Sequence, residues 1–73
     1  MDREEVVRDG LLSVPETGRF LSLSRSKVYL LMERGELAFV KFGRARRIPR
    51  RAVIELAARN LTGGWRTGGA NDG

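Results

Sequence analysis

The chain has 73 residues, among them neither cysteine nor histidine. A chain of this length makes one small domain, whose folding buries roughly 60% of the surface that the unfolded chain exposes. The composition excludes disulfides, thiolate zinc sites and histidine bases, so we expect no cofactor, no metal and no catalytic residue, and hence not an enzyme. The positive indication is charge, because 14 Lys and Arg outnumber 9 Asp and Glu and give a net charge of +5.

The sequence carries no targeting signal that we can identify. No stretch reaches the roughly 18 apolar residues of a membrane span, and the N-terminus lacks the basic-then-apolar order of a signal peptide. We therefore expect a cytoplasmic protein with no membrane partner.

Charge and glycine content divide the chain into three parts. Residues 1–10 have a net charge of −2 and predict a flexible acidic segment outside the core. Residues 19–51 contain ten basic and two acidic side chains, which is typical of an anion-binding surface, although arginine-rich chains are also typical of GC-rich genomes. Residues 62–73 contain five of the nine glycines and predict a flexible tail, which leaves 11–61 as the folded domain.

The first helix is predicted to begin after Ser13. Ser13 and Glu16 have the spacing of a capping box, in which each side chain accepts a hydrogen bond from the other residue's backbone amide. The inward stripe at helical spacing is Val14, Thr17, Gly18 and Leu21. Because glycine weakens a helix by about 1 kcal/mol relative to alanine, we expect Gly18 to serve close packing with another helix. The helix should end near Ser22.

A second helix is predicted between Ser24, as the N-cap residue, and Gly35, as the glycine just past the end. Its core stripe is Val28, Leu31 and Met32. Only residues 22–24 separate the two helices, so they should cross steeply as a helix-turn-helix.

The outward face of the second helix has the residue types that read DNA. Its first turns present Arg25, Ser26, Lys27, Tyr29 and Leu30. Arg and Lys can donate to guanine in a major groove, and an apolar side chain can contact a thymine methyl. A single exposed leucine is also common on ordinary surfaces, so Leu30 is compatible with both interpretations.

Alternating apolar and polar residues replace the helical period after the second helix and predict a β-hairpin. We expect strands at 39–42 and 46–48, joined by a turn at 43–45. The residues expected to pack on the helices are Val40, Phe42 and Ile48. The tip carries Arg44, Arg46 and Arg47. The hairpin is either a wing that grips phosphates or enters a minor groove, which we favour, or a solvated basic turn.

A third helix is predicted from Arg50 to about Leu61, after Pro49 ends the strand. The residues expected to face inward and close the core are Val53, Ile54, Ala57 and Leu61. The expected fold class is mainly α with a small β-hairpin, a winged helix-turn-helix of three helices and a two-stranded wing.

This order of elements resembles the excisionase-type helix-turn-helix family, small MerR-like winged-helix domains of recombination directionality factors. The resemblance is carried by the segments 11–16, 23–29, 34–37 and 42–50, which read LLSVPE, LSRSKVY, RGEL and FGRARRIPR. It implies a recognition helix in the major groove and a wing against the adjacent minor groove or its phosphates. Two departures are the pair Thr17 and Gly18, where the family commonly has two alanines, and Leu30, where it is commonly polar or basic.

The resemblance and the charge pattern together define the candidate site. The candidate DNA-binding residues are Arg25, Ser26, Lys27, Tyr29, Leu30, Arg34, Lys41, Arg44, Arg46, Arg47 and Arg50. The candidate partner-binding residues are Leu61, Trp65 and Arg66, since Trp and Arg are enriched at protein interfaces. The alternative for these three is a tail with an incidental tryptophan.

The expected function is that of an excisionase from a phage or integrative element, in a bacterial or phage-infected cell. Such a protein binds and bends attachment-site DNA, contacts a site-specific integrase and binds cooperatively with other copies of itself. We favour it over a small MerR-like transcriptional regulator because no effector domain, dimerising coiled coil or metal-sensing cysteine is visible. A third alternative is a protein-interaction module that uses Leu30, Phe39 and Trp65.

Overall fold

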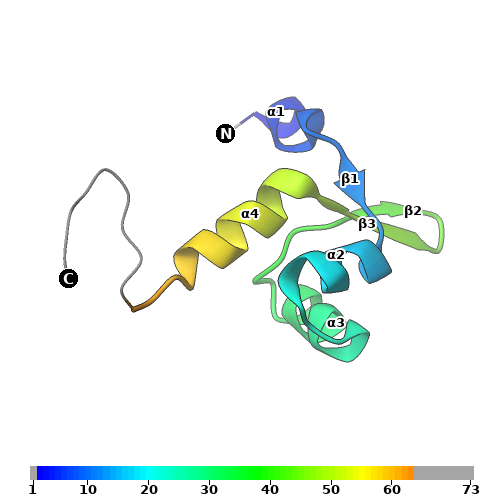
Figure 1. Cartoon of the computed structure of the whole chain (residues 1–73). Helices are drawn as coiled ribbons and strands as arrows, with labels where there is room; N and C mark the ends of the chain where they lie inside the picture. Colours follow the sequence, from blue (N-terminus) through cyan, green and yellow to red (C-terminus); the bar gives the residue numbers. More distant parts are fainter. Residues whose placement is uncertain (1, 64–73) are drawn as a thin grey trace.

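The computed structural model describes residues 2–63, which form four helices and a three-stranded antiparallel sheet (Figure 1). The elements are α1 (Arg3–Arg8), β1 (Leu11–Leu12), α2 (Val14–Leu21), α3 (Arg25–Glu33), β2 (Val40–Phe42), β3 (Ala45–Pro49) and α4 (Arg50–Arg59). The predicted winged helix-turn-helix is confirmed, with α2 and α3 as its two helices and β2 and β3 as its wing. Two elements, α1 and β1, were not predicted. Trp65 and Arg66 lie outside the described residues.

The boundaries of α2 and α3 follow from local hydrogen bonds. The Ser13 amide donates to Glu16 Oε1 at 2.8 Å and the Glu16 amide donates to Ser13 Oγ at 3.1 Å, which confirms the capping box. Ser24 caps α3 by accepting from the Lys27 amide at 3.2 Å. Gly35 follows the C-cap of α3 with a φ of 76°, as a glycine just past a helix end should.

Gly18 allows a close backbone approach, but to the turn after α2 rather than to another helix as predicted. A Cβ at this position would lie 2.8 Å from the carbonyl oxygen of Leu23, and the Leu23 amide donates to the Gly18 carbonyl at 2.8 Å. The close neighbour is therefore the backbone of the turn between the helices. Glycine at this position lets the chain leave α2 and reach the start of α3 within three residues.

The sheet has the order β1-β3-β2, so β3 is its central strand. The segment Leu11–Leu12, for which no strand was predicted, pairs with β3 as β1, in the register Leu12 to Ile48. The wing turn contains two residues rather than three, because Ala45 already pairs with Phe42. Gly43 has a φ of 62°, which suits the first central position of a type II′ turn.

The predicted packing of the wing was wrong for Phe42. Val40 lies opposite Arg47, and Lys41 lies opposite Arg46. Directly paired residues share a face, and neighbours along a strand alternate, so Ile48 shares its face with Arg46 and Lys41. Ile48 is fully buried, Val40 on the other face is half-buried, and Phe42 is 59% exposed.

The hydrophobic core lies between the two crossing helices, β1, β3 and α4. Its members are Leu12, Val14, Val28, Leu31, Met32, Leu37, Ile48, Val53 and Leu56, with the buried Thr17 among them. The Thr17 hydroxyl donates to the Ser13 carbonyl at 2.9 Å, so its burial costs no hydrogen bond. Leu37, for which no burial was predicted, is only 1% exposed and lies in the loop between α3 and β2.

The predicted inward face of α4 was only partly right. Val53 and Leu56 are buried, whereas Ile54 is 48% exposed, Leu61 is 57% exposed and Ala57 is on the surface. The helix carries two adjacent apolar stripes with the same period. One consists of residues 53 and 56, and the other of residues 54, 57 and 61. Periodicity does not choose between two such stripes, and the direction in which α4 leaves β3 brings the first against the core.

The acidic segment at the N-terminus contains the helix α1, which lies beside the start of α4 (Figure 1). Asp2 caps it by accepting from the Glu4 amide, and none of residues 3–8 is buried. Asp9 Oδ2 lies 3.7 Å from Arg51 Nε, which links the segment to α4. Across residues 2–63 no helix has the length and apolarity needed to cross a membrane.

Candidate nucleic-acid interface

The outward face of α3 is built by its own packing. Val28, Leu31 and Met32 are buried, which turns Ser26 and Leu30 toward solvent on the opposite side of the helix. Tyr29 lies at the edge of this face and is exposed, as predicted. The face is open to a ligand over the whole first half of the helix.

Arg46 joins this face to the wing. Its guanidinium carbon lies 4.8 Å from the ring centroid of Phe39 and 5.5 Å from that of Tyr29. Its Nη1 atom lies 3.5 Å from Glu33 Oε2, and the side chain is only 25% exposed. The charge of Arg46 thus rests between two rings and a carboxylate of α3. We call Arg46, Tyr29, Phe39 and Glu33 the Arg46 clamp.

The Arg46 clamp changes the interpretation of two predicted residues. The exposed Phe39 packs against a guanidinium, so its exposure does not require a protein partner. Arg46 was predicted to contact DNA from the wing, and in the structure it is engaged within the protein. Its clearest structural role is to hold the wing against α3.

Arg47 points to the other face of β3. It is half-buried, and its Nη1 donates to the Arg46 carbonyl at 2.9 Å. The side chain lies near the N-terminus of α2, where hydrogen bonds from the Ser13 backbone and side chain, and then the charges of Arg19 and Arg47, lower the pKa of Glu16. Arg47 therefore contributes positive charge at the root of the wing rather than at its tip.

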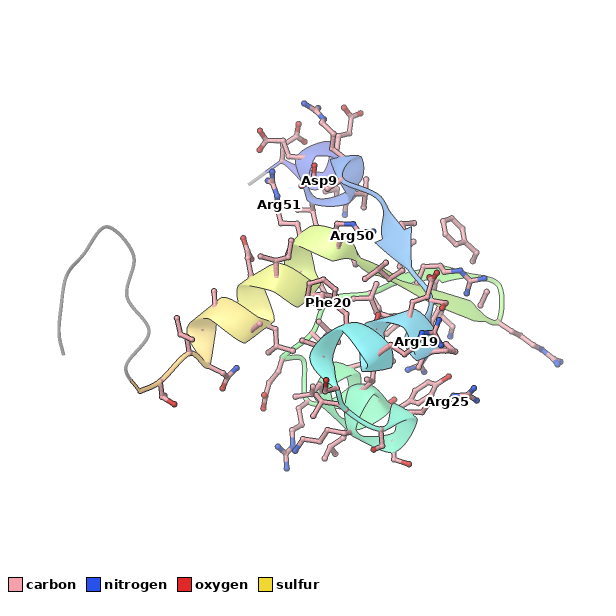
Figure 2. The ribbon with its side chains drawn as sticks, in the orientation of Figure 1. Asp9, Arg19, Phe20, Arg25, Arg50 and Arg51 are labelled. Carbon is pink, nitrogen blue, oxygen red and sulfur yellow. The ribbon has the colours of Figure 1, made fainter. Side chains whose placement is uncertain are left out.

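Arg19 is a basic residue that the site prediction missed. Together with Pro15, Gly18, Ser22, Leu23 and Arg25 it lines a shallow groove between α2 and α3. Figure 2 shows Arg19 and Arg25 on the same side of the molecule as the wing. The signal was present in the sequence, since Arg19 belongs to the basic segment and lies opposite the inward stripe of α2.

Lys27 and Arg34 lie elsewhere on α3. Both line a second groove, toward the end of α4, whose walls include Leu23, Leu56 and Ala57. Arg34 Nη1 also lies 3.9 Å from Glu36 Oε2. These two predicted site residues therefore lie on the side of α3 that faces α4, on the opposite edge of the helix from Arg25.

The remaining predicted residues divide between the wing and the far side of the fold. Lys41 and Arg44 are exposed on the wing, Arg44 in its turn. Arg50 begins α4, where its amide donates to the Gly10 carbonyl at 2.9 Å, and Figure 2 shows it near β1 and α1. The structure thus brings together one surface, which we call the basic face. It consists of Arg19, Arg25, Ser26, Tyr29, Leu30, Lys41 and Arg44, joined by the Arg46 clamp.

Comparison with known proteins assigns this arrangement to a family. Residues 11–61 match the family model described as "Helix-turn-helix domain". The chain belongs to this helix-turn-helix family. A protein named "Probable excisionase" from Saccharopolyspora erythraea is 49% identical over 49 residues, which are 67% of this chain and 50% of that protein. The chain therefore spans about half the length of this curated relative, and no solved structure matches it.

The family assignment agrees with the geometry of this helix-turn-helix domain. Its match begins at β1 and ends just after α4, so α1 lies outside it. Together the family and the relative support a DNA-binding domain of the excisionase type, as the sequence resemblance predicted. In helix-turn-helix domains of known DNA complexes the second helix enters the major groove. The helix in that position of this chain is α3.

Proposed function

We propose that this helix-turn-helix domain acts as an excisionase, a non-catalytic recombination directionality factor. In this role it binds and bends attachment-site DNA and contacts a site-specific integrase, so that recombination runs toward excision. The observation that supports the proposal most strongly is the Arg46 clamp, which joins α3 and the wing into one basic face. The proposed role requires a cytoplasmic location, where bacterial and phage DNA lie.

The basic face offers two kinds of contact. Arg25 and Ser26 lie in the first turn of α3, the part of a recognition helix that reaches base edges, and Leu30 can meet a thymine methyl one turn later. Lys41 and Arg44 on the wing, and Arg19 on α2, suit phosphates on either side of the groove. Base contacts from α3 would specify the sequence, and the flanking cations would supply most of the affinity.

A single module of this size needs partners to reach useful specificity. One such domain buries about 600–1,000 Å² of protein surface on DNA, at the low end for specific complexes. The exposed apolar stripe of α4, Ile54, Ala57 and Leu61, lies outside the basic face and supports a protein contact there. We propose that this stripe, together with Trp65 and Arg66, contacts the integrase or a second copy on neighbouring DNA.

Titration of DNA binding against salt tests the DNA part of the proposal. If the four cations of the basic face, Arg19, Arg25, Lys41 and Arg44, neutralise about four phosphates, the logarithm of the binding constant should fall with the logarithm of salt concentration at a slope of about −3.6. A nearly flat response would favour a protein-interaction module instead. Specific binding at a promoter, with no effect on an integrase, would favour a transcriptional regulator.

A further inference from the structure

Phe42 is the most exposed large apolar side chain of residues 2–63, at 59%. It is the last residue of β2 before the turn of the wing, and its cross-strand neighbour is the small Ala45. The register turns it away from Ile48 and the core, and the ring is left without a large neighbour across the strand. An exposed phenylalanine at a hairpin tip loses the hydrophobic stabilisation that burial would give it, so folding does not explain it.

The surroundings of Phe42 suggest which ligand could cover the ring. Lys41 precedes it and Arg44 follows it in the turn, and both are exposed. Lys41 lies on the opposite face of β2 from the ring and Arg44 lies in the turn, so an apolar protein surface that enclosed the tip would have to desolvate both cations, which is costly. Double-stranded DNA offers phosphates to the cations and, a few ångströms further in, the faces of stacked base pairs to the ring.

The tip of the wing is held in a fixed position relative to α3. Its two strands pair up to a two-residue turn, so Phe42 has little freedom to swing away. The Arg46 clamp then fixes the hairpin against α3 through Tyr29 and Glu33. Figure 1 shows the hairpin extending beyond α2 and α3, which leaves the tip clear of the helices.

We propose that Phe42 inserts from the minor groove against a base step and kinks the DNA there. This inference rests on the proposed DNA-binding function and names the residue that produces the bend. Apolar wedges such as phenylalanine unstack a base step and bend the duplex by about 20–90° toward the major groove. Arg25 and Leu30 would read the base sequence in the adjacent major groove, while Phe42 would set the bend of the DNA.

The test uses the full chain and duplexes selected by the wild-type protein from a random-sequence library. 2-Aminopurine is placed at each step in turn to report unstacking, and dyes at both ends report the bend by energy transfer. We expect wild-type protein to raise the fluorescence at one step beside the α3 site. Phe42→Ala should lose this rise and most of the bend, while Phe42→Leu, which keeps an apolar wedge, should retain both in large part.

Binding affinity should respond much less than bending. The dissociation constant of Phe42→Ala should change by less than about tenfold, because the lost stacking and the avoided unstacking offset each other. Phe20→Ala is the matched control, since Phe20 is an exposed phenylalanine on α2, away from the tip of the wing (Figure 2). It should leave fluorescence and bend unchanged, and both variants should unfold at the wild-type temperature.

Three outcomes would overturn the inference. The first is wild-type binding to the selected duplex without unstacking at any step, and the second is a Phe42→Ala variant that unstacks and bends as wild type does. The third is binding to anionic phospholipid vesicles that Phe42→Ala abolishes while DNA bending is unchanged. If the library yields no duplex that the wild-type protein binds, the proposed function itself fails, which is a different result.

Discussion

The guanidinium of Arg46 lies over the ring of Tyr29, with 5.5 Å between the guanidinium carbon and the ring centroid. Arg46 belongs to the central strand of the sheet, and Tyr29 belongs to the second helix of the helix-turn-helix. Their contact, together with that of Phe39 at 4.8 Å from the same guanidinium carbon, fixes how far the wing lies from the recognition helix. Two parts of the basic face that are distant in sequence can therefore meet one duplex in a single geometry.

Replacement of Arg46 should disturb this geometry even when the charge is kept. Arg46→Lys loses the planar group that rests on two rings, so it should weaken DNA binding nearly as much as Arg46→Ala. Either change should lower the free energy of unfolding by about 1 kcal/mol, mostly from the ring contacts, because Glu33 is exposed and its ion pair is screened. Urea unfolding and DNA titration measure the two effects.

Arg44→Lys is the control for Arg46, since Arg44 is exposed in the wing turn and needs only its charge to contact phosphate. It should bind DNA nearly as well as wild type. If Arg46→Lys also bound as wild type does, Arg46 would be a simple phosphate contact and the clamp would have no role in binding.

Arg44 and Arg25 should differ in what their loss does to recognition. Arg44→Ala should weaken binding to all sequences and reduce the magnitude of the salt slope by about one unit, as the loss of one phosphate contact does. Arg25→Ala should instead cost about 1–3 kcal/mol on the preferred duplex and little on random DNA. Titrations on both duplexes at several salt concentrations separate the two. Equal weakening on both duplexes by Arg25→Ala would remove its assignment to base reading.

Gly18→Ala should destabilise the fold although alanine is the better helix former. Helix propensity alone predicts a gain of about 1 kcal/mol. The added Cβ would meet the Leu23 carbonyl oxygen at 2.8 Å, and this oxygen belongs to the backbone of the turn, which has little room to move. We expect a net loss of about 1–3 kcal/mol, which is typical of overpacking. Thermal unfolding decides the sign, and a stabilised variant would contradict the close approach.

Protonation of Glu16 should make the folded state less stable in acid. Hydrogen bonds from the Ser13 backbone and side chain lower the pKa of Glu16 in the folded chain below its ordinary value of 4.5. A lowered pKa stabilises the folded state at pH values above 4.5, and this contribution is lost as the pH falls through the folded value. Glu16→Gln should lower the unfolding temperature at pH 7, and this deficit should shrink as the pH falls below 4.5. A deficit that stays constant until the protein unfolds in acid would mean that the charge of Glu16 has no part in it.

The parts of the fold that the sequence predicted are those decided by local chemistry. Ser13 and Ser24 begin helices through hydrogen bonds within a few residues, and Gly35 follows a helix end with a left-handed backbone angle; all three have their predicted roles. The strand β1 was missed because two residues are too few for a pattern, and its pairing with Ile48 depends on a segment 36 positions away. Such pairing is a tertiary effect that no local window reveals.

The candidate site was predicted mainly as a set of basic residues, and the structure places only some of them on the basic face. Arg25 and Arg44 lie on the basic face, whereas Lys27 turns toward α4 because of its place on the helix circumference. Arg46 is not a free cation, because its guanidinium contacts the rings of Phe39 and Tyr29. These contacts join residues of different elements, so the spacing of residues in the sequence does not predict them. The error for Phe42 came from assigning the wrong face to a strand of three residues.

The most direct test of the account is an integrase recombination assay on paired attachment sites, run in both directions with and without this protein. The integrase and the sites should come from the element that encodes the chain. We predict that the protein raises excision and does not raise integration, and that Arg25→Ala and Arg46→Lys lose this effect while Phe20→Ala keeps it. Excision that proceeds equally with and without the protein would contradict the proposed function.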